Sequence, residues 1–178
     1  SDVCSSDLTP EQEHYIGRSV AAEIVARPTM RVSGDAKLDD YVSDVGQAIV
    51  QLAPSVGQTF EGYRFTLMES PTVNAIAAPG GYVFVTRGLV QAARNEDELA
   101  AVLAHEIAHV QLHHGLSAIR ESNLVEAANI VGTEMTRGSQ SQLTGLFGSS
   151  VQEVVSEVVT KGFSREQEAE AEIGRAHV

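Results

Sequence analysis

Apolar residues recur at helical spacing in two stretches near the start of the chain. Across residues 35–52, apolar positions three or four apart form one stripe, which predicts an amphipathic helix. The stripe contains Leu38, Val42, Val45 and Ile49. An earlier helix is expected over residues 9–26. Its first residues suit a helix start, because Thr9 can cap it, Pro10 fits the first turn and Gln12 completes a capping box.

The pattern changes between residues 63 and 86. Three short segments there, YRFTLME, TVNAIAA and GYVFVT, are rich in residues that favour strands. They are separated by Pro71 and by the sequence Pro79-Gly80-Gly81, which are typical of turns. We predict three strands of one small sheet.

Helical spacing returns in the segment NEDELAAVLAHEIAHVQLHHG, residues 95–115. Asn95 suits the N-cap, Glu98 is placed to complete a capping box, and Gly115 is a plausible stop. The apolar stripe contains Leu99, Val102, Leu103, Ile107 and Val110. This is the clearest predicted helix in the chain.

The remaining residues have mainly helical character. From residue 116 to 162 the pattern is interrupted by RGSQSQLTGLFGSS, residues 137–150, which is a candidate for a lid or for an ordinary connector. A last helix is expected to begin near Ser164, with Gln167 three residues after the cap. The predicted fold is α+β and mainly helical, with a small sheet beside the helix at residues 95–115.

Composition excludes several classes of function. The 178 residues carry a formal net charge of −12, which disfavours binding to nucleic acid or to an anionic membrane surface. No apolar run approaches the roughly 18 residues that a membrane span requires. The length predicts a single domain with a core of its own.

The two ends of the chain are related through DNA. One coding sequence for residues 2–8, read on its opposite strand, encodes residues 173–178. We therefore expect residues 1–8 and 173–178 to be translated adapter DNA, and residues 9–172 to be one domain that is truncated on its C-terminal side. Cys4 and His177 are then not native, and a leader could have preceded the fragment.

The motif His105-Glu106-Ile107-Ala108-His109 has the form HExxH. Two histidines four residues apart share one face of a helix and can hold one Zn²⁺. Glu106 lies one step round the helix, where its carboxylate can take a proton from a zinc-bound water. Because the flanks of the motif are apolar, three ionisable groups there would be costly without a metal partner.

A catalytic zinc of this type needs a third protein ligand. The closing stretch FSREQEAEAE offers four glutamates. Glu168 and Glu172 share one helix face, Glu166 and Glu170 share another, and periodicity alone does not choose between the pairs. His114 is interpreted as a polar residue at a helix end, and His14 as a surface residue of the first helix.

Together these motifs resemble a zinc metallopeptidase family. NAIAAPGGYVFVTRGLV, DELAAVLAHEIAHVQLHH and FSREQEAEAE are similar to the strand pair, the zinc helix and the third-ligand motif of the gluzincin family that includes the CAAX prenyl endopeptidases, HtpX-type proteases and BepA-type proteases. The resemblance covers most of residues 9–172 and implies a zincin-like fold. It further implies that His105, His109 and Glu168 bind zinc and that Glu106 is the catalytic base.

The resemblance also implies outer parts of the site. The family's Asp falls on Glu172, which would orient a metal ligand, and the adapter hypothesis predicts a native Asp there. The strand containing Asn74, Ala75, Ile76 and Ala77 is implied to accept an extended peptide substrate. With no long apolar segment, the fragment looks closer to the soluble BepA-like branch, which implies a periplasmic or cell-envelope location in a bacterium.

We therefore predict a zinc-dependent endopeptidase with one Zn²⁺ per chain, acting in envelope protein quality control on protein or peptide substrates. Hydrolysis would proceed by Glu106-assisted attack of zinc-bound water. One alternative is a proteolytically silent, metal-bound chaperone or assembly factor of the envelope. The other is a structural helical domain without metal.

Overall fold

A computed structural model describes residues 8–121, 155–156, 158–160, 162 and 165–176. The predicted lid or connector at residues 137–150, and Ser164 as a helix cap, lie outside the described residues. The helices are α1 (Pro10–Val25), α2 (Ala36–Leu52), α3 (Arg87–Ala92), α4 (Glu96–Gln111), α5 (His114–Glu121) and α8 (Arg165–Arg175), with a short 3-10 turn η1 (Pro79–Gly81). The strands are β1 (Arg31–Val32), β2 (Arg64–Glu69), β3 (Ala75–Ala78) and β4 (Tyr82–Thr86).

The four described strands form one mixed sheet in the order β1-β2-β4-β3. β2 runs parallel to β4, while β1 and β3 pair antiparallel with their neighbours. The α+β, mainly helical fold is confirmed, and so are the three predicted strands. The two-residue strand β1 was not predicted from the sequence, because both of its residues are exposed and so leave no apolar pattern.

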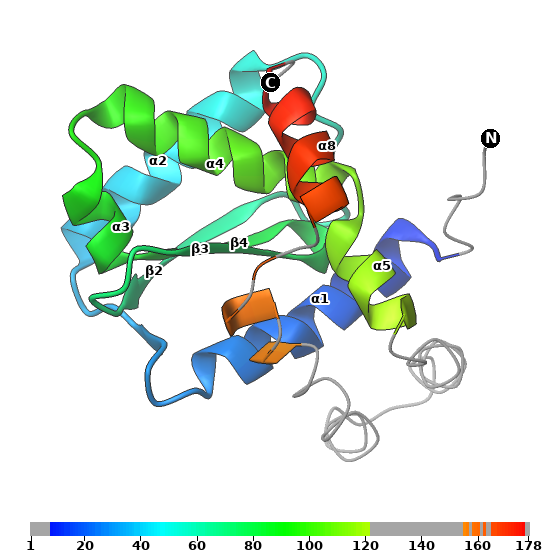
Figure 1. Cartoon of the computed structure of the whole chain (residues 1–178), viewed down its shortest axis with the longest axis horizontal. Coiled ribbons are helices and arrows are strands. Elements are labelled where there is room, and N and C mark those ends of the chain that lie inside the picture. Colours follow the sequence, from blue (N-terminus) through cyan, green and yellow to red (C-terminus); the bar gives the residue numbers. More distant parts are fainter. Residues whose placement is uncertain (1–7, 122–154, 157, 161, 163–164, 177–178) are drawn as a thin grey trace.

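Helices cover both faces of the sheet (Figure 1). Leu67 of β2 is buried in a cluster with α2 and α4, and its neighbour Met68 is buried in a second cluster with α1. This alternation follows from the two-residue period of a strand, which turns successive side chains to opposite faces. As a result, α4 rests on the sheet through Leu103 and Ile107, both fully buried.

The helix starts follow the predicted chemistry with one difference. At α1 both hydrogen bonds of the Thr9–Gln12 capping box are present. At α4 the Asn95 side chain accepts from the backbone N–H of Glu98. The predicted reciprocal bond is wrong, however, because the Glu98 carboxylate accepts from the N–H of Arg94, which also offers its guanidinium.

The predicted stop of α4 at Gly115 is wrong. The helix ends at Gln111, and His113 takes a positive φ of 55°, which turns the chain into α5. Gly115 lies inside α5, where a Cβ would stand 2.9 Å from Cδ of Pro79. The glycine is therefore explained by close packing against η1 rather than by helix termination.

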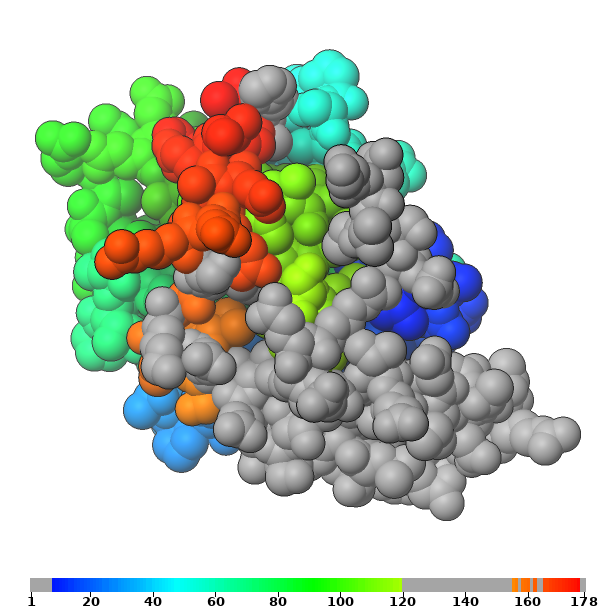
Figure 2. Space-filling model, turned by 45° about the vertical axis from the view of Figure 1, so that its right-hand side comes forward, coloured from blue at the N-terminus to red at the C-terminus, as the bar shows by residue number. Residues whose placement is uncertain are grey.

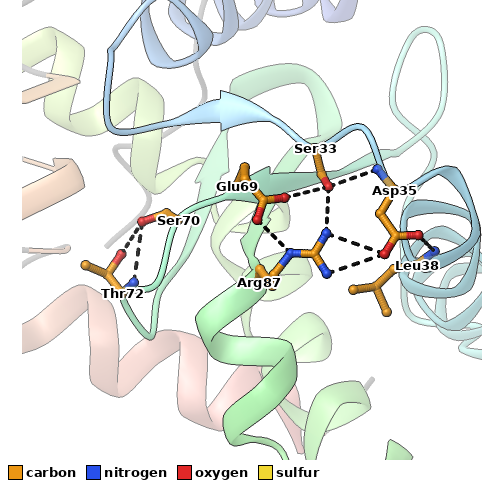
Figure 3. A network of polar contacts seen from close by, with 7 residues as sticks. All are labelled: Ser33, Asp35, Leu38, Glu69, Ser70, Thr72 and Arg87. Carbon is orange, nitrogen blue, oxygen red and sulfur yellow. Dashed lines mark hydrogen bonds and ion pairs between the residues drawn. The ribbon is translucent and has the colours of Figure 1, made fainter.

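A polar network ties β1 and the start of α2 to the end of β2 (Figure 3). Arg87, at the start of α3, donates to Glu69 at 2.8 Å, to Ser33 at 3.1 Å and to Asp35 at 3.4 Å. The guanidinium of Arg87 lowers the pKa of Glu69. Because both carboxylates are substantially exposed, the network orients these segments more than it stabilises them.

A close crossing of α1 over η1 gives a testable packing constraint. A Cβ on Gly17 would lie 1.8 Å from the carbonyl oxygen of Pro79, which is backbone and cannot rotate away. We expect Gly17→Ala to lower the free energy of unfolding by about 1–3 kcal/mol, despite the higher helix propensity of Ala. Urea unfolding followed by circular dichroism measures the change.

Gly34→Ala is the matched control, because nothing lies within 4 Å of the Cβ that it adds. Its effect should stay within about 0.5 kcal/mol. Equal stability of the two variants would show that α1 does not cross η1 at this distance.

Candidate metal centre

Helix α4 carries the HExxH residues between the sheet and α8. Its apolar side faces the core, so the one-turn spacing of His105 and His109 turns both imidazoles toward α8. Helix α8 lies against α4, as the space-filling view also shows (Figure 2). The contact buries Ala171 completely and brings Gly174 against Ala108.

Three potential ligand atoms converge at this contact. Nε2 of His105 lies 3.1 Å from Nε2 of His109 and 3.1 Å from Oε2 of Glu168. Nε2 of His109 lies 3.7 Å from the same carboxylate oxygen. Ligand atoms around a tetrahedral zinc ion, with bonds of about 2.0–2.1 Å, stand about 3.3 Å apart. The donor set and its spacing therefore fit a zinc ion, and the glutamate of this set is Glu168.

Glu106 lies beside these atoms and is 7% exposed. Burial raises its pKa to about 8, the carboxylate of Glu168 adds to the rise, and a backbone hydrogen bond from Ala77 opposes it. A pocket of about 250 Å³ opens between α4 and β3. Its lining includes His105, His109, Glu106 and Glu168, so the metal-ligand candidates and the buried carboxylate share one cavity.

Glu172 lies on the other side of His105. Its Oε2 is 3.4 Å from Nδ1 of His105, the ring nitrogen that does not face Glu168. The carboxylate is 56% exposed and also pairs with Arg175, which lowers its pKa. Glu172 is thus placed where it can hold the ring of His105, and its role as an orienting residue stays a prediction.

His114 is at a helix end, as the first residue of α5, but the sequence does not indicate its burial or its contact with His109. It is 3% exposed, and its Nδ1 lies 2.8 Å from Nδ1 of His109. Its Nε2 lies 3.2 Å from Oε2 of Glu170. Helical spacing did not indicate this contact, because the chain leaves the α4 helix at Leu112 and His113 and only then presents His114.

The four-residue spacing predicts that Glu170 points away from the site when Glu168 faces it. Residues 170 and 172 each lie about 100° from Ala171 around the helix, on opposite sides. Because Ala171 is the centre of the buried face, both flanking glutamates can reach α4 or α5. A rule based only on four-residue spacing groups Glu172 with Glu168. It therefore misses Glu170 on the other side of the buried face.

Burial also sets the charge of the two paired imidazoles. It lowers the pKa of His109 to about 3, with further lowering from the positive charge of His105 and His114. It lowers the pKa of His114 as well, against the opposing carboxylate of Glu170. Both rings are therefore neutral at neutral pH, as metal binding requires of His109.

Strand β3 borders the pocket. Asn74, just before it, accepts from the N–H of Thr86 and donates its side-chain amide to the carbonyl of Val159. Ala75 is partly exposed, while Ile76 and Ala77 are buried on opposite faces of the sheet. The backbone N–H of Ala77 is bonded to Glu106.

His14 is a buried residue, and its interpretation as a surface histidine is wrong. Its ring is 3% exposed and lies 5.7 Å, between centroids, from both Phe60 and Tyr82. The turn η1 presses onto this part of α1, so close that a Cβ on Gly80 would lie 2.8 Å from the His14 Cα. The periodicity of α1 by itself could not show that this turn packs on its surface at His14.

The fold and the donor set define a metallopeptidase. A small mixed sheet lies beside a helix with two histidines and a buried glutamate, and a second helix adds a carboxylate as the third potential metal ligand. The family model of peptidase family M48 matches residues 39–177, and the chain belongs to this family. The family resemblance expected from the motifs is thereby confirmed.

Curated relatives agree. The beta-barrel assembly-enhancing protease of Yersinia pestis is 32% identical over 80% of this chain and 29% of its own length. The metalloprotease YcaL of Escherichia coli (strain K12) is 30% identical over 73% of this chain and 50% of its own length. The mitochondrial metalloendopeptidase OMA1 of Schizosaccharomyces pombe is 39% identical over 44% of this chain and 23% of its own length.

The chain thus spans between about a quarter and a half of the length of these relatives. Within the parts of the chain that the structure describes, no helix combines the length and apolarity needed to cross a membrane.

Proposed function

We propose that this domain is a zinc-dependent endopeptidase that hydrolyses peptide bonds of protein substrates. The observation that carries the proposal is the convergence of His105, His109 and Glu168 beside the buried carboxylate of Glu106 in one pocket. Membership of a peptidase family supports the same reading. We assign the metal-ligand role to the three converging residues.

Glu106 is proposed as the catalytic base. Zinc, when bound, would polarise the scissile carbonyl and lower the pKa of a coordinated water. Glu106 takes a proton from the attacking water and passes it to the leaving amine, with no covalent bond between enzyme and substrate. Burial raises the pKa of Glu106 above that of an exposed glutamate, which makes its carboxylate a stronger proton acceptor.

We further propose that residues Asn74 to Ala77 accept the substrate as an extended strand. β3 is an edge strand of the described sheet and borders the pocket. Since Asn74 bonds to Thr86 of β4, the alternation of antiparallel pairs turns the backbone groups of Ala75 toward the open edge. A peptide pairing there would run past the carboxylate of Glu106.

The relative named beta-barrel assembly-enhancing protease suggests the biological setting. We propose that the domain, residues 9–172, acts in protein quality control in the periplasm or cell envelope of a bacterium. The acidic charge and the peptidase family are consistent with protein substrates rather than nucleic acid.

The proposal is tested with purified protein and an unfolded, fluorescently labelled casein. We expect about one zinc per chain by elemental analysis, cleavage that a zinc chelator abolishes, and recovery when zinc is restored. Absence of stoichiometric zinc would contradict the metal centre. Zinc without cleavage, in protein extended to the length of its relatives, would instead favour the metal-bound chaperone.

A further inference from the structure

A line of polar groups leads away from His109 on the side opposite Glu168. Nδ1 of His109 meets Nδ1 of His114 at 2.8 Å, and Nε2 of His114 meets the Glu170 carboxylate at 3.2 Å. His109 and His114 are 2% and 3% exposed, whereas the Glu170 side chain is 65% exposed. The line therefore runs from the interior to the surface through one buried imidazole.

Hydrogen-bond chemistry fixes where the protons sit along this line. An ionised carboxylate only accepts, so the Nε2 of His114 carries the proton that it donates to Glu170. A neutral imidazole has one N–H, which leaves Nδ1 of His114 as an acceptor. Two ring nitrogens 2.8 Å apart need one proton between them, and this proton must belong to Nδ1 of His109.

The consequence falls on the other nitrogen of His109. With its proton on Nδ1, the ring presents a lone pair at Nε2, the atom that faces His105 Nε2 at 3.1 Å and Glu168 Oε2 at 3.7 Å. This is the tautomer that a metal ligand needs. We propose that His114, itself oriented by Glu170, is a positioning residue that fixes the tautomer and ring orientation of His109 for metal binding.

The proposal rests on the metal centre proposed above. It assigns a different role to each of three glutamates of α8. Glu168 contributes a ligand atom, and Glu172 lies directly against Nδ1 of His105 at 3.4 Å. Glu170 reaches His109 only through His114. Each proposed ligand histidine is thus supported by a carboxylate of α8. Glu172 contacts His105 directly, whereas Glu170 acts on His109 through His114, a chain that we call the relay.

Two substitutions separate the hydrogen bond from the packing. His114→Phe fills the cavity without an acceptor, while His114→Asn can place its amide oxygen near the former Nδ1 position. We expect His114→Phe to weaken zinc binding by about 10–100-fold and His114→Asn to stay within about threefold of the unmodified protein. Competition with a chromogenic zinc chelator measures these affinities, and circular dichroism checks that each variant is folded.

A spectroscopic measurement on the unmodified, zinc-loaded protein tests the tautomer itself. Long-range proton–nitrogen NMR of the imidazoles should show that Nδ1 is protonated in His109. It should show that Nε2 is protonated in His114. A His109 ring with its proton on Nε2 would overturn the proposal even if His114→Phe did not fold. Unchanged zinc affinity in folded His114→Phe would overturn it too.

The two proposals fail in different ways. If the unmodified protein binds no zinc, the metal centre is wrong and the relay falls with it. If the unmodified protein binds zinc and the His114 variants bind it equally well, the metal centre stands and only the relay is wrong. Glu166→Ala, which removes an exposed carboxylate from the same helix, should leave zinc affinity unchanged in either case.

Discussion

Replacing Glu106 with Gln is expected to lower the rate of peptide cleavage by about 10²–10⁴-fold while zinc remains bound. Gln keeps the size of the side chain and can still accept the backbone hydrogen bond of Ala77, but it cannot take a proton from water. The zinc ligands proposed here, His105, His109 and Glu168, are untouched. Cleavage of labelled casein and zinc content are measured on the same preparation.

Asp97→Asn is the matched control for this substitution. It makes the same carboxylate-to-amide change at an exposed position in the first turn of α4. Its cleavage rate should equal that of the unmodified protein. Cleavage by Glu106→Gln at the control rate would rule out Glu106 as the base, whatever the metal content.

Removing the proposed third ligand is expected to have the second large effect. Glu168→Ala deletes the only carboxylate oxygen that lies near both Nε2 atoms of the described site, at 3.1 Å from His105 and 3.7 Å from His109. Loss of an outer residue that orients a ligand costs about 10–100-fold in affinity, so loss of a ligand itself should cost more than about 100-fold. Chelator competition measures the change.

Glu166→Ala again provides the comparison, because it removes the same group two residues earlier on α8. The side chain at 166 is exposed, and its removal should not alter zinc affinity. If both alanine variants bound zinc as tightly as the unmodified protein, the third ligand would have to be another residue. Glu172→Ala would then be the first variant to examine, since its carboxylate also lies beside His105.

The sequence by itself determined the local features of this protein. Thr9, Asp35 and Asn95 cap the helices that their neighbours predict, because a cap depends on residues only two or three positions away. The HExxH spacing likewise places His105 and His109 on one face through helix geometry alone. The family resemblance then pointed to Glu168, which the structure brings to both imidazoles.

The tertiary structure alone decided which side chains meet across elements. Periodicity could not show that η1 would pack onto α1 at His14, or that Gly115 was needed beside Pro79 rather than at a helix end. It also could not place His114 behind His109, with Glu170 beyond it. The contacts of His114 depend on how α8 crosses α4 and on the turn at His113, and a repeat along one helix contains no information about its angle to another.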